Sequence, residues 1–317
     1  MENKVTVIIP NYNNRQLLEN LLKSLDDAQH KYPFSILIVD DNSQDDSVEF
    51  IKENYPDIEL IANTQNHGFA YTVNCGIRNT TSEFIYLLNN DTTVNEDFLI
   101  EALKTLNSEN NIFAVSSKML QMNNPGFIDD AGDEYTIMGW SKKRGDGKPI
   151  IKYAHDSEVF SACAGAALYR RDIFDEIGYF DENFGSYVED MDLSFRAKLH
   201  GYKIYYSANS IVNHYGSAAT GSRYNAFKVE ISARNNIYMI YKNMNIFMLV
   251  LNFIFICLGI IIKYLFFHHK GFEKQYISGI RKAMKSRGNL KKTENIKAKN
   301  YLKVEFEMIK NTLTYIF

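Results

Sequence analysis

Polar side chains that suit a nucleotide follow several apolar runs in the first hundred residues. Parallel strands end along one edge of a sheet, and open α/β folds bind ligands at that edge. Tyr12 offers a ring on which a base can stack, and Asp41 offers a carboxylate to the base or ribose, with Asp40 beside it. Gly68 permits close backbone approach. Because an isolated acidic pair before a serine is often a helix cap, only the whole set predicts a nucleotide pocket.

A diphosphate needs positive charge around it, and the sequence has no glycine-rich Walker loop to cradle one. A hard divalent cation, Mn²⁺ or Mg²⁺, held by oxygen ligands is the usual alternative. Asp91 closes the polar triplet Asn89-Asn90-Asp91 and is the best candidate ligand, with Asn90 a candidate for nucleotide contact. His214 offers a nitrogen ligand, although a lone histidine is more often an ordinary partly buried side chain.

A second acidic cluster precedes an expected helix over residues 191–199. Carboxylates in the first turn of a helix are favoured by its positive end, so the cluster has a purely structural interpretation. The functional interpretation is a general base beside a reacting hydroxyl. The cluster comprises Asp181, Glu182, Glu189, Asp190 and Asp192.

Alternating strand and helix patterns predict an α/β fold with a mostly parallel central sheet and right-handed crossovers. Ser43 and Asp46 form a plausible capping pair for the second helix. Residues 118–160, rich in Gly and Asp, are expected to be an irregular substrate-side loop region. We expect strands over 5–10, 35–40, 58–62, 84–88, 113–117 and 166–169, and helices over 17–25, 46–55, 70–79, 96–107, 172–177, 191–199 and 226–244.

The predicted division is a catalytic domain over 1–225 and a helical, membrane-associating region over 226–317. Within the domain, 1–117 form the nucleotide-binding half and 118–225 the acceptor and catalytic half. The hydrophobic fraction of 45% excludes global disorder. Three widely spaced cysteines and an apolar strand pattern close to the first residue, with no signal peptide, indicate a cytosolic location for the catalytic machinery.

The charge is distributed unevenly, although the net charge is only −3. Residues 263–317 contain 13 Lys and Arg against 4 Asp and Glu. A basic segment after an apolar run predicts contact with anionic lipid head groups, and a solvated helical face is the alternative. Residues 246–262, extended by 264–267, are at the lower limit for spanning a bilayer; an interfacial helix or a soluble core helix also fits. Nucleic acid is disfavoured because no recognisable binding module is present.

Six ordered motifs resemble family 2 glycosyltransferases of the GT-A fold, and most closely their rhamnosyltransferase-like branch. The resemblance runs from about residue 5 to residue 235 and includes the closing Arg234-Asn235. Its motifs are VIIPNYNN, IVDDNSQDDS, NHGFAYTVNCGI, YLLNNDTTV, CAGAALYRRDIFDEIGYFDENFGSYVEDMDLSFRAKLHGYKI and VNHYGS.

The resemblance implies roles for particular residues. Asp91 matches the last carboxylate of the family's metal-binding Asp-x-Asp motif, and His214 matches the histidine that completes the coordination. Asp190 matches the catalytic base, with Glu189 beside it binding the acceptor or orienting the base. The implied contacts to the donor nucleotide are Pro10, Tyr12, Asp41 and Asn66.

The sequence departs from the family pattern at three points. Asn89 replaces the first Asp of the Asp-x-Asp motif and brings no negative charge. Thr72-Val73-Asn74 stands where Ala-Arg-Asn is common, so an arginine is missing for the pyrophosphate, and Arg223 or the loop over 217–220 is expected to compensate. No Gln-x-x-Arg-Trp motif is present and Trp140 is the sole tryptophan, which argues against a processive synthase.

Together these features imply an inverting, metal-dependent transfer of a sugar from a nucleotide-diphosphate donor, either dTDP-rhamnose or a UDP-hexose. The implied acceptor is a hydroxyl of a glycan or lipid-linked glycan, in cell-surface polysaccharide synthesis at the cytoplasmic face of the membrane. Two alternatives remain open: a nucleotidyltransferase, which would release pyrophosphate, and a non-catalytic sugar-nucleotide-binding scaffold on the membrane.

Overall fold

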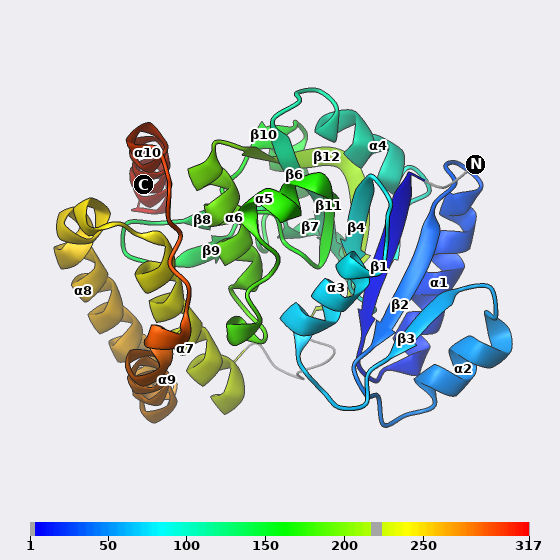
Figure 1. Cartoon of the computed structure of the whole chain (residues 1–317), viewed down its shortest axis with the longest axis horizontal. Helices are drawn as coiled ribbons and strands as arrows, with labels where there is room; N and C mark the ends of the chain where they lie inside the picture. The colour runs from blue at the N-terminus through cyan, green and yellow to red at the C-terminus, as the bar shows by residue number, and fades with distance from the viewer. Residues whose placement is uncertain (1–3, 217–223, 317) are drawn as a thin grey trace.

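The computed structural model describes residues 4–216 and 224–316. One large sheet, with the strand order β10-β12-β6-β11-β4-β1-β2-β3, dominates the first two thirds of the chain (Figure 1). β5 pairs with β12, β7 pairs with β6, and β8 and β9 form a separate hairpin. The strands are β1 Val5–Asn11, β2 Ser35–Asp40, β3 Glu59–Ala62, β4 Phe84–Leu88, β5 Thr92–Val94, β6 Ile112–Gln121, β7 Asn124–Asp130, β8 Asp133–Tyr135, β9 Ser141–Lys143, β10 Ser157–Glu158, β11 Ala166–Arg170 and β12 Lys203–His214.

The strands β3, β2, β1 and β4 are all parallel, as their alternation with helices predicts. Their ends are in register, because Asn11 pairs with Asp40 and Asp40 pairs with Ala62. The polar residues that follow these strands therefore lie along one edge of the sheet. β11 runs antiparallel between β4 and β6, so the sheet as a whole is mixed.

The expectation that residues 118–160 are irregular is wrong. β6 continues through Gln121, and β7, β8, β9 and β10 all lie within this stretch. β6 pairs in parallel with β12, more than 80 residues later in the chain, and antiparallel with β7. β10 also pairs with β12, whereas β8 and β9 pair with each other over three residues. Local periodicity does not reveal these strands, because they are short or irregular in register, or depend on a distant partner.

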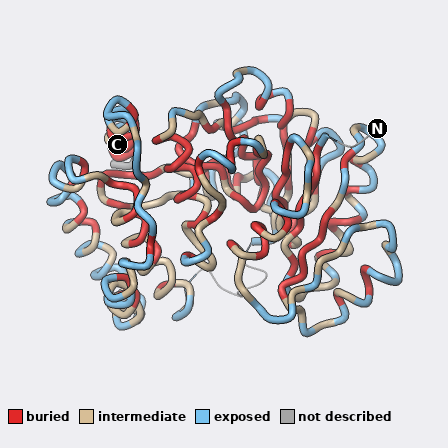
Figure 2. The backbone as a smooth tube through the Cα atoms, viewed as in Figure 1, coloured by how far each residue is buried: buried red, intermediate tan, exposed pale blue. Residues whose placement is uncertain are grey.

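Helices cover both faces of the sheet, and the alternation of side chains along β1 shows how. Val7 and Ile9 pack with α1, α2 and α4 on one face, whereas Ile8 packs with α3, α5 and α6 on the other. Figure 2 shows the buried sheet between these more exposed helices. The helices are α1 Arg15–Gln29, α2 Ser47–Asn54, α3 Phe69–Arg78, α4 Phe98–Leu106, α5 Asp172–Ile177, α6 Glu189–His200, α7 Ala226–Asn243, α8 Ile246–His269, α9 Glu273–Ser286 and α10 Ala298–Ile316.

The prediction that Ser43 and Asp46 form a capping pair for α2 is wrong. Asp46 occupies the cap position, but its side chain makes no capping hydrogen bond. Ser43 instead donates its hydroxyl hydrogen to Asp40, and Asp45 accepts hydrogen bonds from the backbone N–H and the hydroxyl of Ser47. The second strand therefore ends in a fixed loop, and its acidic residues are used to shape that loop.

Four helices, α7 to α10, follow the sheet and form a lobe beside it, on the left in Figure 1. A core that includes Phe195, Met239 and Met308 joins α6, α7 and α10. α8 is 24 residues long and contains an 18-residue window with a mean hydropathy of 2.6. Only a narrow stripe of the helix is buried: Met248, Asn252, Ile256 and Gly259. The boundaries predicted at 117 and 225 stay a prediction.

Candidate functional site

Asp41 organises the edge of the sheet where a nucleotide is expected. Its carboxylate accepts hydrogen bonds from the Asn63 side chain at 2.9 Å, from the His67 backbone N–H at 3.0 Å and from the Gly68 backbone N–H at 2.8 Å. Gly68 has a φ of +86°, and a Cβ there would be 3.5 Å from the carbonyl oxygen of Gly185. The close approach expected of Gly68 is thus made to the loop before α6.

Asp40 and Asn90 are buried or half-buried and brace the neighbouring loops. Asn11 donates to Asp40 Oδ2 at 2.7 Å, and the Ser43 backbone N–H donates to Oδ1 at 2.9 Å. Asn90 Nδ2 donates to Asn11 Oδ1 at 2.8 Å and to the Asn13 carbonyl at 3.1 Å. The contacts of these two residues point to positioning of the loops between β1, β2 and β4.

Other residues expected at the donor side are accessible. Tyr12 is 43% exposed, Asn66 is exposed and Pro10 is half-buried. A surface ring next to the braced loops is available for stacking, as the nucleotide hypothesis requires. Direct contact of these residues with a donor stays a prediction.

Asp91 and His214 meet where β4 ends and β12 ends. His214 Nε2 lies 3.3 Å from Asp91 Oδ1, and His214 Nδ1 lies 2.9 Å from Asp129 Oδ2. The antiparallel pairing of β12 with β5, which sets His214 opposite Thr92, brings this histidine beside Asp91. Asp129, near the end of β7, is not among the residues predicted from the sequence, because β7 lies in the stretch that was expected to be irregular.

The histidine is held between two carboxylates. Burial opposes its charged form, but the hydrogen bonds to Asp129 and Asp91 outweigh burial and raise the pKa of His214 to about 9. Burial alone would raise the pKa of Asp129, yet the hydrogen bond with His214 and the charge of Lys143 lower that pKa to about 2. The site is therefore strongly charged.

The donor set of Asp91 and His214 fits a divalent cation. A carboxylate oxygen and an imidazole nitrogen face each other, and a second carboxylate fixes the other ring nitrogen, as in many metal sites. Deprotonated Nε2 would then be free for coordination. A separate group, Asp130, Asp133 and Cys163, has potential ligand atoms within 4.8 Å of one another but is more enclosed.

An open pocket of about 610 Å³ lies over this pair. Asn89, Asp91, Asp129 and His214 line one side of it. Lys143 also lines the pocket and lies 3.0 Å from Asp129 Oδ2, while its charge acts on Asp190 as well. One basic side chain thus lines the pocket beside Asp129 and has a small favourable effect on the ionised form of Asp190.

Asp190 and Glu189 begin α6 and differ in their hydrogen bonds. Asp190 Oδ1 accepts a hydrogen bond from the Met191 backbone N–H at 2.7 Å, and burial raises the pKa of the carboxyl. Burial, and then the charge of Asp190, raise the pKa of Glu189 well above its usual range. Glu189 Oε2 is buried and has no hydrogen-bond partner among the described residues. Among the described residues, no Lys, Arg or His side chain forms a direct ion pair with either carboxyl.

The other acidic residues of the cluster have structural partners. Asp192 lies 2.9 Å from both the Arg196 guanidinium and the Lys242 ammonium group, and it is fully buried. Asp181 lies 2.6 Å from Lys242. Asp181 and Asp192 thus have structural roles as ion-pair partners. Glu189 and Asp190 remain candidates for the general base and its neighbour.

A strained turn sets the direction in which α6 begins. Tyr187 and Val188 have φ angles of +68° and +72°, which side-chain-bearing residues rarely adopt. Asn235 on α7 is buried and donates from Nδ2 to the carbonyls of Phe184, Ser186 and Tyr187, at 2.9, 2.9 and 2.7 Å. Asn235 therefore holds the turn that delivers Glu189 and Asp190, a role that the sequence did not indicate.

The substitutes suggested for the missing arginine lie outside the described residues, namely Arg223 and the loop over 217–220. Within the described part of the chain, Lys143 and Lys228 line the pocket. Asn74, in the departing triplet, donates to the Phe180 carbonyl at 2.8 Å and accepts from its N–H, so it fixes the loop before α6.

The sequence matches the family model "Glycosyl transferase family 2" over residues 6–178, more than half of the chain. The chain belongs to this family. It is 28% identical over 229 residues to the "O-antigen biosynthesis protein RfbC" of Myxococcus xanthus, covering 68% of this chain and 18% of that protein. It is 28% identical over 217 residues to the "O-antigen chain rhamnosyltransferase RfbN" of Salmonella typhimurium, covering 67% of this chain and 66% of that protein.

A solved structure with the same fold is the "Mannosyltransferase PcManGT from Pyrobaculum calidifontis in complex with GDP-Man and Mn2+". The TM-score is 0.57 at 16% identity, over 90% of this chain and 76% of that chain. The GT-A-type α/β fold expected from the sequence, with a C-terminal helical extension, is confirmed. So is the resemblance to the rhamnosyltransferase-like branch.

Proposed function

We propose that the chain transfers a sugar from a nucleotide-diphosphate donor to a hydroxyl of a glycan or lipid-linked glycan, with inversion at the anomeric carbon. The rhamnosyltransferase relative favours dTDP-rhamnose as the donor, with a UDP-hexose as the alternative. Two relatives are named for O-antigen synthesis, which supports a role of the reaction in the assembly of a cell-surface polysaccharide. The transfer is non-processive and depends on Mn²⁺ or Mg²⁺.

One observation carries this proposal: Asp91 and His214 line one pocket together with Tyr187, which lies three residues before Asp190 in the turn that begins α6. Asp91 and His214 are 3.3 Å apart and line the pocket. Lys143 also lines it and acts electrostatically on Asp190, 99 residues after Asp91 in the chain. An ion site for a leaving diphosphate and a carboxyl for an attacking hydroxyl are the two parts that such a transfer needs.

The reaction is a single displacement. Asp190 accepts the proton of the acceptor hydroxyl as that oxygen forms a bond to the anomeric carbon, on the face opposite the diphosphate. The bond from the anomeric carbon to the diphosphate breaks, and its electron pair leaves with the nucleoside diphosphate. Asp91 and His214 would hold the divalent cation, which would neutralise the charge that develops on that leaving group.

Burial suits Asp190 to this role. The carboxyl is taken out of water and its pKa is raised, which makes its ionised form a better base than an exposed aspartate. Glu189 contacts the acceptor or orients Asp190, and its unpaired Oε2 is available for a sugar hydroxyl. On the donor side, Tyr12, Pro10 and Asn66 contact the nucleotide directly.

The remaining donor-side residues act through the loops. Asp41 and Gly68 fix the backbone between β3 and α3, while Asp40 and Asn90 fix the loops after β1 and β4. A nucleotide then meets surfaces that are rigid before it binds, which reduces the entropy lost on binding.

The enzyme works on the cytoplasmic face of the cell membrane, with α8 lying in the interface. Ile246, Val250 and Ile254 on α8 are 76%, 70% and 68% exposed, a surface that water does not favour. Two anchors hold the helix against the rest of the chain: Asn252 donates to Glu305 at 3.0 Å, and Gly259 packs tightly on Met138. A helix fixed along one side is more consistent with lying on the bilayer than with crossing it.

The test is to incubate the full chain with a panel of nucleotide sugars, with and without Mn²⁺ or Mg²⁺, and to identify the products. The proposal expects metal-dependent release of a nucleoside diphosphate from one donor. Release of pyrophosphate would identify a nucleotidyltransferase. No turnover with any donor would leave a binding scaffold as the explanation.

A further inference from the structure

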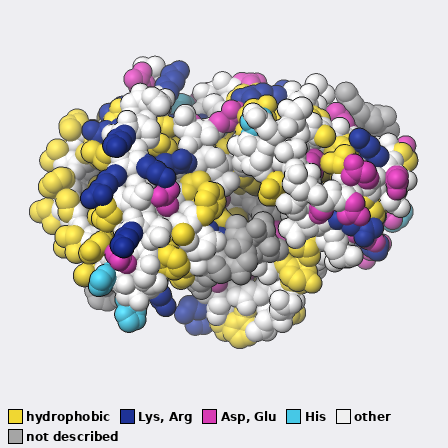
Figure 3. Space-filling view, turned by 90° about the horizontal axis from the view of Figure 1, so that it is seen from below, with side chains coloured by type: hydrophobic (Ala, Val, Ile, Leu, Met, Phe, Trp, Pro, Cys, Tyr) yellow, Lys and Arg dark blue, Asp and Glu magenta, His cyan; other side chains and the backbone are white. Residues whose placement is uncertain are grey.

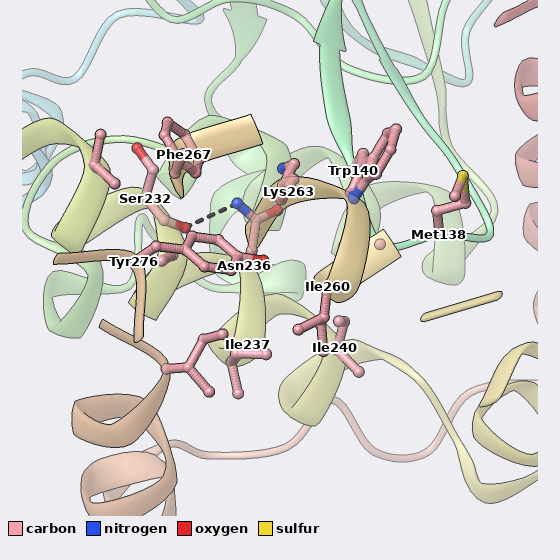
Figure 4. Close-up of a pocket in the computed structure, with 14 residues that line it drawn as sticks. Met138, Trp140, Ser232, Asn236, Ile237, Ile240, Ile260, Lys263, Phe267 and Tyr276 are labelled. Atoms are coloured by element: carbon pink, nitrogen blue, oxygen red, sulfur yellow. Dashed lines mark hydrogen bonds between the residues drawn. The ribbon is translucent and has the colours of Figure 1, made fainter. Parts of the chain in front are cut away.

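A small pocket lies beneath α8, between α7, α9 and the hairpin loop that joins β8 to β9. Its volume is about 60 Å³, several times what one water molecule needs. Its walls are mostly apolar, with Ile240, Ile260 and Tyr276 among them. Figure 4 shows Lys263 of α8 and Trp140 of the hairpin side by side at one end, and Phe267 at the other. The pocket therefore combines apolar walls with a single ammonium group.

Lys263 is half-buried, and its surroundings meet its polar requirement only in part. Its Nζ lies 5.5 Å from the centre of the Trp140 ring, a cation–π contact that offsets only part of the loss of water. Among residues 4–216 and 224–314, no carboxylate forms an ion pair with it. Burial lowers the pKa of Lys263 to about 8, and an anion in the pocket would reverse that effect.

A neighbouring amide is also incompletely satisfied. Asn236 on α7 donates from Nδ2 to the Ser232 carbonyl at 2.8 Å, the dashed line in Figure 4. Its Oδ1 is buried and has no hydrogen-bond partner in the described part of the chain. A cation and a free acceptor in an apolar pocket suit a phosphate group that carries a hydrocarbon chain on one side and, on the other, a sugar whose hydroxyl can donate to Oδ1.

The pocket lies next to the catalytic cleft. Val229, Ser232 and Phe267 line both of them. On its other side the pocket is closed by α8, whose outer face is apolar and exposed. Figure 3 shows hydrophobic side chains gathered at one end of the molecule, with Lys and Arg side chains next to them. A ligand with a hydrocarbon tail in a membrane could therefore reach the cleft through this pocket.

We propose that this pocket binds the phosphate of a lipid-linked acceptor, with Lys263 as its counter-ion and the hydrocarbon chain leaving along α8. The inference rests on the proposed function, because it assigns the acceptor of that reaction. The pocket, at about 60 Å³, has room for one phosphate but not for a bulky phospholipid head group, and the side chains that it shares with the cleft place the sugar end of the acceptor towards the Asp91–His214 pair. Lys263 is a binding residue in this assignment and takes no part in bond making.

The chain contains its own reporter for the test. Trp140 is the only tryptophan in the sequence and lines the pocket beside Lys263, so its fluorescence reports on an occupant. The full chain is titrated with farnesyl phosphate below its micelle concentration. We expect a saturable change, with an affinity at least about tenfold weaker in Lys263→Gln. Lys263→Arg should retain binding, and so should Lys270→Gln, the matched control, because Lys270 is an exposed lysine just beyond α8.

Several outcomes would overturn the assignment. Equal affinity for farnesol would show that phosphate is not recognised, and equal affinity of Lys263→Gln would remove the lysine from its role. An equal fluorescence change with vesicles of phosphatidylcholine and phosphatidylglycerol would point to bulk phospholipid as the occupant. The absence of any saturable change would remove the site. Nucleotide-sugar turnover is measured separately on the unmodified protein, so failure of the proposed function and failure of this pocket are distinguishable.

Discussion

The Nδ1 atom of His214 lies 2.9 Å from Oδ2 of Asp129, which leaves Nε2 of the same ring facing Asp91. Asp129 therefore selects which ring nitrogen is available to a metal ion. The two residues are brought together by β12 and β7, which both pair with β6. The arrangement gives Asp129 a supporting role that is separate from direct coordination.

The first prediction concerns that support. We expect Asp129→Asn to weaken Mn²⁺ binding by about 10- to 100-fold, because outer carboxylates orient the ligating imidazole and increase its basicity. Titration of Mn²⁺ followed by electron paramagnetic resonance measures the change. Asp57→Asn, at an exposed acidic residue away from the cleft, is the control. Unaltered Mn²⁺ affinity in Asp129→Asn would contradict this role.

A second prediction follows from the raised pKa of His214. Its folded-state pKa of about 9 exceeds the ordinary 6.5, so its charged form stabilises the metal-free protein fully below pH 6.5. This contribution is lost as the pH rises through 9. We expect the free energy of unfolding to decrease over that range by up to about 3 kcal/mol more than in His214→Ala.

Urea denaturation at pH 6 and pH 9 without metal measures this difference. The control is His30→Ala. His30 is an exposed histidine at the C-terminal end of α1, and this variant should keep the pH dependence of the unmodified protein. If His214→Ala shows the same pH dependence as the unmodified protein, the charged His214 contributes nothing.

Much of the fold follows from local sequence patterns, whereas parts of the site do not. β2 and β4 coincide with the predicted ranges because each is a mostly apolar run buried inside the sheet, β2 between two parallel strands and β4 between one parallel and one antiparallel strand. Asp91 and Asp190 are recognisable because they lie within characteristic motifs. Asp129 and Lys143 are not, since β7 pairs with the preceding β6 through register shifts and β9 pairs with β8 over only three residues, so neither strand shows a clear two-residue alternation.

Asn235 shows a different limit. Its letter is visible in the sequence, but its role depends on three carbonyls that lie about 50 residues earlier. Backbone carbonyls leave no trace in a sequence, because every residue has one. Only the packing of α7 against the turn before α6 reveals the contact.

The third prediction tests Asn235. Asn235→Ala removes the donor that three carbonyls share, of which that of Phe184 is buried, and frees a strained turn. We expect a loss of about 1–3 kcal/mol in the free energy of unfolding, together with lower turnover, because Asp190 is no longer aimed. Denaturation and nucleotide-sugar assays measure the two effects. Asn111→Ala, at an exposed asparagine, is the control; full stability and turnover in Asn235→Ala would refute this role.

The fourth prediction concerns α8. We expect Phe253→Asp combined with Ile254→Asp to reduce binding to anionic vesicles strongly, since each charge would have to enter the apolar part of the interface. Both residues are more than 60% exposed, so the fold should be retained. Vesicle flotation measures binding, and Ile151→Asp, at an isoleucine 78% exposed elsewhere, is the matched control. Equal loss in both variants would show that α8 is not the contact.

The most direct test of the central claim, that Asp91, His214 and Asp190 serve one cleft, is turnover of the preferred nucleotide sugar by Asp190→Asn. We predict that turnover falls by roughly 100- to 10,000-fold, while Mn²⁺ affinity and donor binding stay near those of the unmodified protein. Asp172→Asn, at an exposed aspartate on α5, should leave turnover intact. An unchanged rate in Asp190→Asn would contradict the account.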